Sequence, residues 1–127
     1  MSCGSGGWGT MPHRGAERFK QITGVEMAHV PYRGSAPANT ALLSGDVPVH
    51  FDIEFSAQPL LKAGRLRSLR VTALKRSPHF PDVPTLDEQG PKGSELYSWF
   101  GIVTRRRTPT PFVDQPTTAT TEVIATP

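Results

Sequence analysis

The sequence has a single cysteine, Cys3, among its 127 residues. One thiol forms no disulfide within the chain and supplies no multi-cysteine zinc site. Histidine is also sparse, and the spacing of its four occurrences matches no common metal-binding motif. We therefore expect the protein to bind no metal and no other cofactor. The four histidines are His13, His29, His50 and His79.

Long hydrophobic runs are missing as well. No stretch of the sequence approaches the roughly 18 consecutive apolar residues that a transmembrane helix needs. Residues 1–11 are small and rich in glycine, and they lack the basic segment and apolar run of a signal peptide. From this pattern alone we expect the chain as written to remain in the cytoplasm.

The sequence also lacks a strong excess of one charge. It has 14 Lys and Arg against 11 Asp and Glu, a net charge of +3. Because the two signs are interleaved, we expect no nucleic-acid partner. One dense basic cluster, Arg105–Arg107, is of the kind that binds phosphate groups, but its Thr and Pro neighbours favour a solvated run. A basic interaction module that binds an anion or nucleic acid through this cluster remains an alternative.

What the sequence does have is an alternation of helical and strand-like patterns. The spacing of apolar residues predicts helices over 11–22, 36–43 and 56–62, and strands over 26–30, 47–52, 65–72 and 97–103. Such alternation is typical of an α/β fold with a parallel or mixed sheet and flanking helices.

The length of the chain fits one domain, and its composition changes near Arg105. Beyond that residue the sequence is rich in Thr and Pro and has few large apolar side chains. Such a segment buries too little apolar surface to order itself. We therefore expect a domain over residues 1–104 and a poorly ordered tail over 105–127.

Two short segments combine a glycine-containing loop with the start of a helix. They are Ser5-Gly6-Gly7-Trp8-Gly9-Thr10, where Thr10 is the expected N-cap, and Tyr32-Arg33-Gly34-Ser35-Ala36-Pro37. Free backbone N–H groups and the positive end of the helix dipole suit an anion at such a place. We expect no strand before the first loop, so a dinucleotide site is not indicated. The alternatives are a disordered N-terminus and an ordinary turn in which Ser35 caps the helix.

Catalysis has little support in the sequence. Ser35 lies in no nucleophile-elbow motif. Asp52 and Glu54 would share one side of a strand if the strand continued past Asp52, which would make a carboxylate pair for acid and base chemistry. Carboxylates at the end of a strand more often face solvent or cap a helix. We therefore expect no enzyme activity.

Residues 19–101 resemble the tripartite tricarboxylate transporter receptors, or Bug proteins, which are bacterial extracytoplasmic solute-binding proteins. The most specific string is His-Val-Pro-Tyr-Arg-Gly-Ser-Ala-Pro-Ala at 29–38. Further matches are Phe-Lys-Gln-Ile-Thr-Gly-Val at 19–25, Leu-Leu-Ser-Gly-Asp-Val at 42–47, Pro-Asp-Val-Pro-Thr at 81–85 and Ser-Trp-Phe-Gly at 98–101. The resemblance implies one lobe of a two-domain, type II periplasmic-binding-protein-like fold that is not an enzyme.

The resemblance also implies a function and a site. Family members capture a small carboxylate in the periplasm and deliver it to membrane transporter subunits. The family's Ser-x-Gly-x-Gly-Thr-x-x-His loop and the second loop assign ligand-binding roles to Ser5, Gly7, Gly9, Thr10, His13, Tyr32, Gly34, Ser35, Ala36 and Asp52.

The sequence departs from the family pattern at several places. A signal peptide and a first domain would precede Ser5, where only Met1–Gly4 stand, and Thr-rich residues replace the expected final helix. Pro48 and Arg70 interrupt expected strands. We therefore expect carboxylate binding that is impaired by truncation. A gene remnant that does not fold stably is a further alternative.

Overall fold

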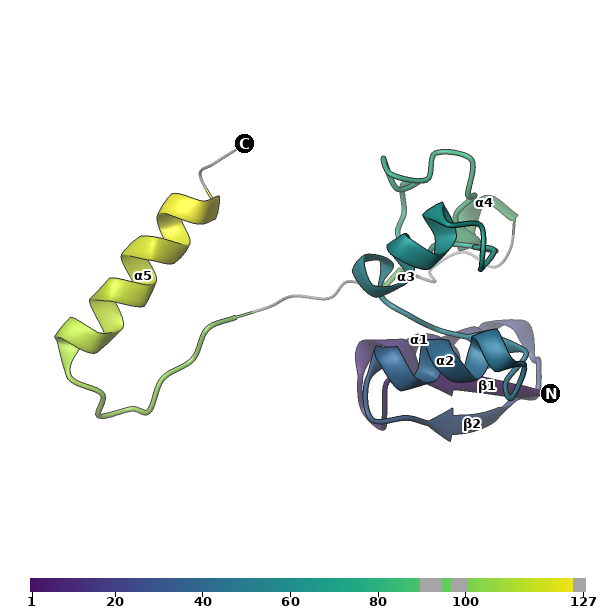
Figure 1. Cartoon of the computed structure of the whole chain (residues 1–127), viewed down its shortest axis with the longest axis horizontal. Coiled ribbons are helices and arrows are strands. Elements are labelled where there is room, and N and C mark those ends of the chain that lie inside the picture. The colour runs from purple at the N-terminus through teal and green to yellow at the C-terminus, as the bar shows by residue number, and fades with distance from the viewer. Residues whose placement is uncertain (90–94, 97–100, 125–127) are drawn as a thin grey trace.

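The computed structural model describes residues 1–89, 95–96 and 101–124 and has an α/β fold (Figure 1). The described elements are β1 (Ser2–Ser5), α1 (Met11–Thr23), β2 (Ala28–Pro31), α2 (Ser35–Ser44), β3 (Val49–His50), α3 (Glu54–Lys62), α4 (Leu86–Gln89) and α5 (Thr110–Ile124). The α/β class is therefore confirmed. No helix among the described residues is both long and apolar enough to cross a membrane.

A three-stranded parallel sheet in the order β2-β1-β3 forms the centre of the fold. The expectation that no strand precedes the first loop is wrong, because β1 is the middle strand. Its sequence, Ser-Cys-Gly-Ser, contains no β-branched or aromatic residue and so gives no strand signal. Cys3, Gly4 and Ser5 are all buried. The pairing of β1 with strands on both sides makes this segment a strand.

Helix α1 begins and ends where the sequence predicts. The Thr10 side chain accepts a hydrogen bond from His13 N, and Gly24 closes the helix in the left-handed conformation at φ 70°. The inner side of α1 meets the sheet in a small apolar cluster. Its members are Cys3, Ala16 and Met27, with Phe19, Val49 and Phe51 packed against them.

Helix α2 has a different N-terminus from the one expected. Gly34 is the N-cap, and Ser35 is the first helical residue and caps nothing. The Ser35 hydroxyl instead donates to the Asp52 carboxylate at 2.6 Å. The capping role is absent because Ser35 stands one residue inside the helix, where its side chain faces Asp52.

The strands expected after α2 are shorter than predicted. The segment 47–52 contributes only Val49 and His50 to the sheet, directly after Pro48, which has no N–H to donate. The segment 65–72 forms no strand and makes one parallel bridge, from Val71 to Thr85. Residues 97–100 of the last expected strand lie outside the described residues, and 101–103 are not in a strand.

The idea of an acid and base pair at Asp52 and Glu54 is also wrong. The strand stops at His50, and Glu54 begins α3. The Glu54 carboxylate accepts a hydrogen bond from Ser77 at 2.7 Å, whereas Asp52 accepts from Ser35. The two carboxylates therefore serve separate contacts.

Residues 110–124 form helix α5, an element that the sequence analysis did not predict, and the expectation of a poorly ordered tail stays a prediction. Figure 1 shows α5 set apart from the rest of the chain, and none of its residues is buried. Its apolar residues Phe112, Pro116, Ala119 and Val123 recur at helical spacing, a signal that the Thr-rich composition obscures. Thr hydroxyls donate to carbonyls four residues earlier, for example Thr117 to Val113 at 2.7 Å. The domain boundary at residue 104 stays a prediction.

Because α5 buries none of its side chains, it adds little to the stability of the sheet domain. A chain that ends at Thr104 should therefore keep the urea unfolding midpoint of the full chain, as measured by circular dichroism. A loss of more than about 1 kcal/mol, which exceeds the usual effect of a surface change, would contradict this prediction.

Gly4 is packed too tightly to accept a side chain. A Cβ there would lie 3.3 Å from His50 Nδ1 and 3.4 Å from a Val47 methyl. Gly4→Val should therefore lower the free energy of unfolding by about 1–3 kcal/mol, the usual cost of overpacking. The matched control is Ser2→Val in the same strand, where the side chain is half-buried. Equal unfolding midpoints for the two variants in urea would count against the packing argument.

Candidate functional site

The two loops that sequence analysis selected lie side by side, at the carboxyl ends of β1 and β2. Tyr32 N donates to Ser5 O at 3.0 Å, and Gly34 N donates to Gly6 O at 3.1 Å. The parallel pairing of the strands sets this arrangement, because it brings the starts of α1 and α2 to the same edge of the sheet. The structure therefore unites the two candidate sites into one surface.

Two glycines make this close approach possible. Gly7 has φ 127°, and a Cβ on it would lie 3.1 Å from the Tyr32 carbonyl oxygen. Gly34 has φ 105°, a conformation that residues with a Cβ rarely adopt. A larger residue at either position would strain or separate the loops.

The hydroxyl groups of the first loop contact the loop's own backbone and His29 of β2. Thr10 Oγ1 donates to Gly7 O at 2.7 Å and accepts from His13 N at 3.4 Å. Ser5 is fully buried, and its Oγ accepts from Gly7 N at 3.2 Å and lies 2.6 Å from His29 Nε2. These side chains shape the loop from inside.

An aromatic cluster stands beside the first loop and contains Trp8, His13 and His29. The two imidazole rings stack with centroids 4.1 Å apart, and the indole meets both rings edge-on at 4.9 and 4.7 Å. His13 Nδ1 accepts a hydrogen bond from Gly9 N at 3.0 Å. Burial, together with the neighbouring His13, lowers the pKa of His29 and so favours its neutral form. Sequence reasoning did not include Trp8 or His29 in the site, although both stand in the matched motifs.

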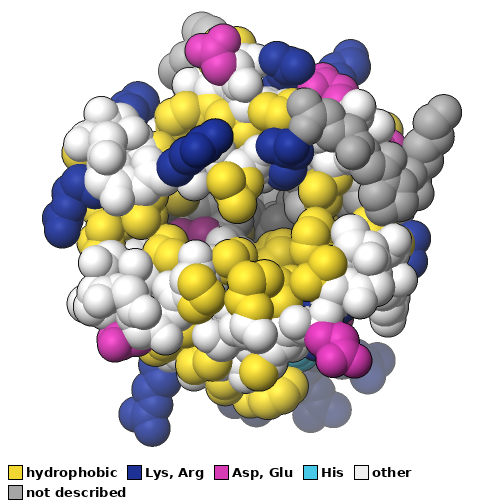
Figure 2. Space-filling model, turned by 90° about the vertical axis from the view of Figure 1, so that its right-hand side faces the viewer, with side chains coloured by type: hydrophobic (Ala, Val, Ile, Leu, Met, Phe, Trp, Pro, Cys, Tyr) yellow, Lys and Arg dark blue, Asp and Glu magenta, His cyan; other side chains and the backbone are white. Residues whose placement is uncertain are grey.

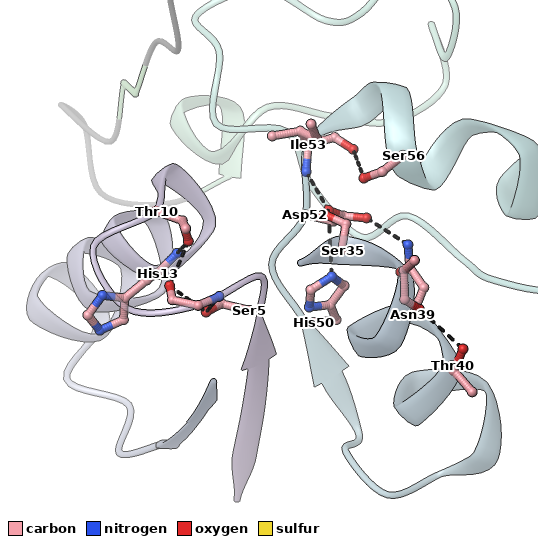
Figure 3. Close-up of polar contacts among 12 residues, drawn as sticks. Ser5, Thr10, His13, Ser35, Asn39, Thr40, His50, Asp52, Ile53 and Ser56 are labelled. Atoms are coloured by element: carbon pink, nitrogen blue, oxygen red, sulfur yellow. Dashed lines mark hydrogen bonds and ion pairs between the residues drawn. The ribbon is translucent and has the colours of Figure 1, made fainter. Parts of the chain in front are cut away.

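Asp52 is the most enclosed charged group at the second loop, with 7% of its side chain exposed. Oδ1 accepts from Ser35 Oγ at 2.6 Å and Ile53 N at 2.9 Å, and Oδ2 accepts from Asn39 Nδ2 at 2.9 Å. His50 Nε2 lies 3.6 Å from Oδ1. Figure 3 shows Asp52 between Ser35, Asn39 and His50. The second loop is therefore tied to the end of β3.

The surroundings of Asp52 decide its ionisation. Burial by itself raises the pKa of the carboxyl, but the nearby His50, the hydrogen bonds from Ser35 and Asn39 and the nearby Ser56 outweigh it and hold the pKa well below the usual aspartate range. The group is therefore an ionised carboxylate at any pH near neutrality. Its charge is satisfied by the protein, not by solvent.

Sequence reasoning missed Asn39 and His50 as partners of Asp52. Asn39 stands four residues after Ser35, on the same face of α2, and His50 stands two residues before Asp52, on the same side of the extended chain. Both spacings were available in the sequence. Nothing in them indicated that the two faces meet.

The remaining predicted residues take varied positions. Ala36 is exposed in the first turn of α2, and Tyr32 is half-buried with its ring 3.4 Å from the position of a Cβ on Gly4. Arg105–Arg107 are exposed in the segment before α5, and their role as a basic module stays a prediction. Among the described residues, no group of three or more His, Cys, Asp or Glu side chains is arranged to hold a metal ion.

Two open hollows lie apart from the loops. One of about 640 Å³ is lined by α1 and the segment before β2, and one of about 520 Å³ is lined by α3 and residues 71–79. Neither includes a residue of the predicted site. On the side of the molecule away from α5, Figure 2 shows hydrophobic side chains around a hollow, with Lys and Arg near its rim.

The family model described as the tripartite tricarboxylate transporter family receptor matches residues 1–127. A protein from the tcbD-tcbE intergenic region of Pseudomonas sp. strain P51 is 37% identical over 128 residues, which is all of this chain and 38% of that protein. A protein from the clcB-clcD intergenic region of Pseudomonas knackmussii is 35% identical over 95% of this chain and 72% of its own length.

Solved structures agree with these sequence matches. An R. palustris protein with adipate is 41% identical, with a TM-score of 0.85 over 93% of this chain and 40% of that chain. MatC from Rhodopseudomonas palustris with bound malate is 27% identical, with a TM-score of 0.85 over 98% of this chain and 42% of its own. The chain thus spans about two fifths of the solved proteins, which is one lobe of a periplasmic binding protein.

The lowered pKa of Asp52 makes the stability of the fold depend on acid pH. The carboxylate's contribution is complete above the usual aspartate pKa of about 3.9 and is lost as the pH falls through the lower pKa of the folded state. Asp52→Asn should cost about 1–3 kcal/mol at pH 7, the range for hydrogen bonds to a buried charged group. This cost should shrink as the pH is lowered below about 4.

Urea unfolding of the wild type and the variant at several pH values measures both effects. The control is Asp114→Asn, at an exposed position on α5, which should leave stability unchanged. A difference between wild type and Asp52→Asn that is the same at pH 7 and at pH 2 would refute the role of this carboxylate.

Proposed function

Because the chain belongs to the tripartite tricarboxylate transporter receptor family, we propose that it binds a small carboxylate at the surface formed by the two loops and the starts of α1 and α2. Family members are solute receptors, and the solved relatives include proteins with adipate and with malate. A dicarboxylate is therefore the class of ligand that we assign to this chain. The family and its structural neighbours are binding proteins, not enzymes.

The observation that carries the proposal is the convergence of two helix N-termini on one edge of the sheet. The first N–H groups of a helix have no partner within it, and the helix dipole places a partial positive charge of about half a unit there. In α2 the Ser35 and Ala36 N–H groups fill this role, whereas Pro37 has no N–H. A carboxylate oxygen satisfies both donors at once.

The first loop contributes in a different way. Gly7 N and Gly9 N already donate to side chains, to Ser5 Oγ and His13 Nδ1. The Gly9 bond is exposed, so a ligand oxygen can replace the imidazole as its acceptor. Trp8, with 71% of its surface exposed, supplies an apolar wall for the carbon chain of the ligand.

A ligand on this lobe remains open to water on its other side. Binding sites for small molecules usually bury most of the ligand surface, and a hydrated carboxylate gains less from each hydrogen bond. We therefore propose weak, about millimolar, affinity for this chain by itself, which corresponds to about 4 kcal/mol. The periplasm as its location and membrane transporter subunits as its partners follow from the family and belong to the same proposal.

A ligand that binds only the folded chain should raise its melting temperature. At a concentration ten times Kd the stabilisation is about 1.4 kcal/mol, which is a shift of several degrees for a domain of this size. Malate, adipate and citrate should each be tested by circular dichroism melting. A cooperative transition without ligand would also contradict the alternative of a gene remnant that does not fold stably.

Two controls separate site binding from a general salt effect. Sodium chloride at matched ionic strength should give no shift, and neither should the dimethyl ester of malate, which lacks the charged oxygens. If none of the three acids shifts the transition, or if chloride shifts it equally, the carboxylate function is wrong for this chain.

A further inference from the structure

The contact between Ser35 and Asp52 has a fixed direction. An ionised carboxylate has acceptor atoms only, so the hydrogen in the 2.6 Å contact belongs to the Ser35 hydroxyl and points at Asp52 Oδ1. The carboxylate is held in place by Ile53 N and Asn39 Nδ2, both at 2.9 Å, and does not turn away. The only hydrogen that Ser35 Oγ carries is therefore directed into the protein.

The opposite side of the same oxygen offers only lone pairs. Ser35 is half-buried at the start of α2, and in the described part of the chain no second hydrogen bond reaches its Oγ. The N–H of the same residue lies in the first turn of the helix and is a donor. Ser35 therefore presents an acceptor and a donor next to each other.

A plain carboxylate matches only half of this pair. Its oxygens accept from the α2 N–H groups. A carboxylate oxygen placed next to Ser35 Oγ, however, would bring two acceptors together with no hydrogen between them, and their lone pairs would repel. The Asp52 charge directly behind Ser35 also disfavours a second negative group there. A hydroxyl group beside the ligand carboxylate removes the conflict, because it donates to Ser35 Oγ.

On the basis of the proposed function, we propose that Asp52 is a positioning residue that sets ligand specificity. By fixing Ser35 Oγ as an acceptor, it makes this lobe prefer a carboxylate that bears a neighbouring hydroxyl group, a 2-hydroxy acid, over the unsubstituted acid. Asp52 acts through Ser35 and does not contact the ligand itself. Asn39, which holds Asp52 Oδ2, supports the same arrangement.

L-Malate and succinate are a matched pair of probes, because they differ by one hydroxyl group. Isothermal titration of the full chain should give malate a Kd about tenfold lower than that of succinate, the worth of one hydrogen bond. In Ser35→Ala the Kd values of malate and succinate should agree within about twofold, because the affinity for malate falls much more than the affinity for succinate.

Asp52→Ala tests the direction of the hydrogen bond separately from its presence. Without the carboxylate, the Ser35 hydroxyl has no acceptor behind it and can turn its hydrogen toward the ligand. The malate to succinate ratio should then fall, and succinate itself should bind at least as well as before. Thr40→Ala is the control, since Thr40 Oγ1 lies exposed on the same helix and donates to Ala36 O. It should leave the ratio unchanged.

The outcomes distinguish this inference from the proposed function. If both acids bind with equal Kd in the wild type, or if Ser35→Ala keeps the tenfold ratio, the role of Asp52 is refuted while carboxylate binding stands. If neither acid binds, the proposed function fails and this inference falls with it. Ser35→Ala removes one oxygen from a half-buried site, so it answers the question even where Asp52→Ala does not fold.

Discussion

The buried carboxylate of Asp52 is the contact on which the second half of the sheet domain depends. Removing an ionised group from water is costly unless every oxygen finds a donor. Ser35 and Asn39 of α2 and Ile53 at the start of α3 donate hydrogen bonds to the carboxylate, and His50 of β3 lies 3.6 Å from it. Because one carboxylate must satisfy all of them, the ends of these elements cannot move independently.

In the first half of the domain, close packing depends on small residues and not on charged ones. The Ser-Cys-Gly-Ser strand between β2 and β3 leaves room for the helices to approach, and Gly7 and Gly34 let the two loops touch through their backbones. The polar side chains of the first loop are consumed in shaping it. The surface that remains toward solvent is made chiefly of backbone donors, which suits an anion and carries little selectivity of its own.

Selectivity then depends on the few side chains at the edge of that surface. A hydroxyl group recognises either a donor or an acceptor, and its neighbour decides which. In our proposal Ser35 is the clearest case, since it donates to the fixed carboxylate behind it and keeps one face of its oxygen for the ligand. The lobe spans about two fifths of the solved relatives, and in our proposal it supplies one wall of the ligand site.

The sequence by itself determined the α/β class, the family, the caps of α1 and the positions of both loops, because each of these depends on local spacing or on a recognisable string of residues. Only the tertiary structure decided that Ser-Cys-Gly-Ser is the central strand, that Ser35 serves Asp52 and not its own helix, and that α5 stands apart. These features depend on which distant segments meet. Strand pairing and buried charge are satisfied by partners far along the chain, and local spacing does not name them.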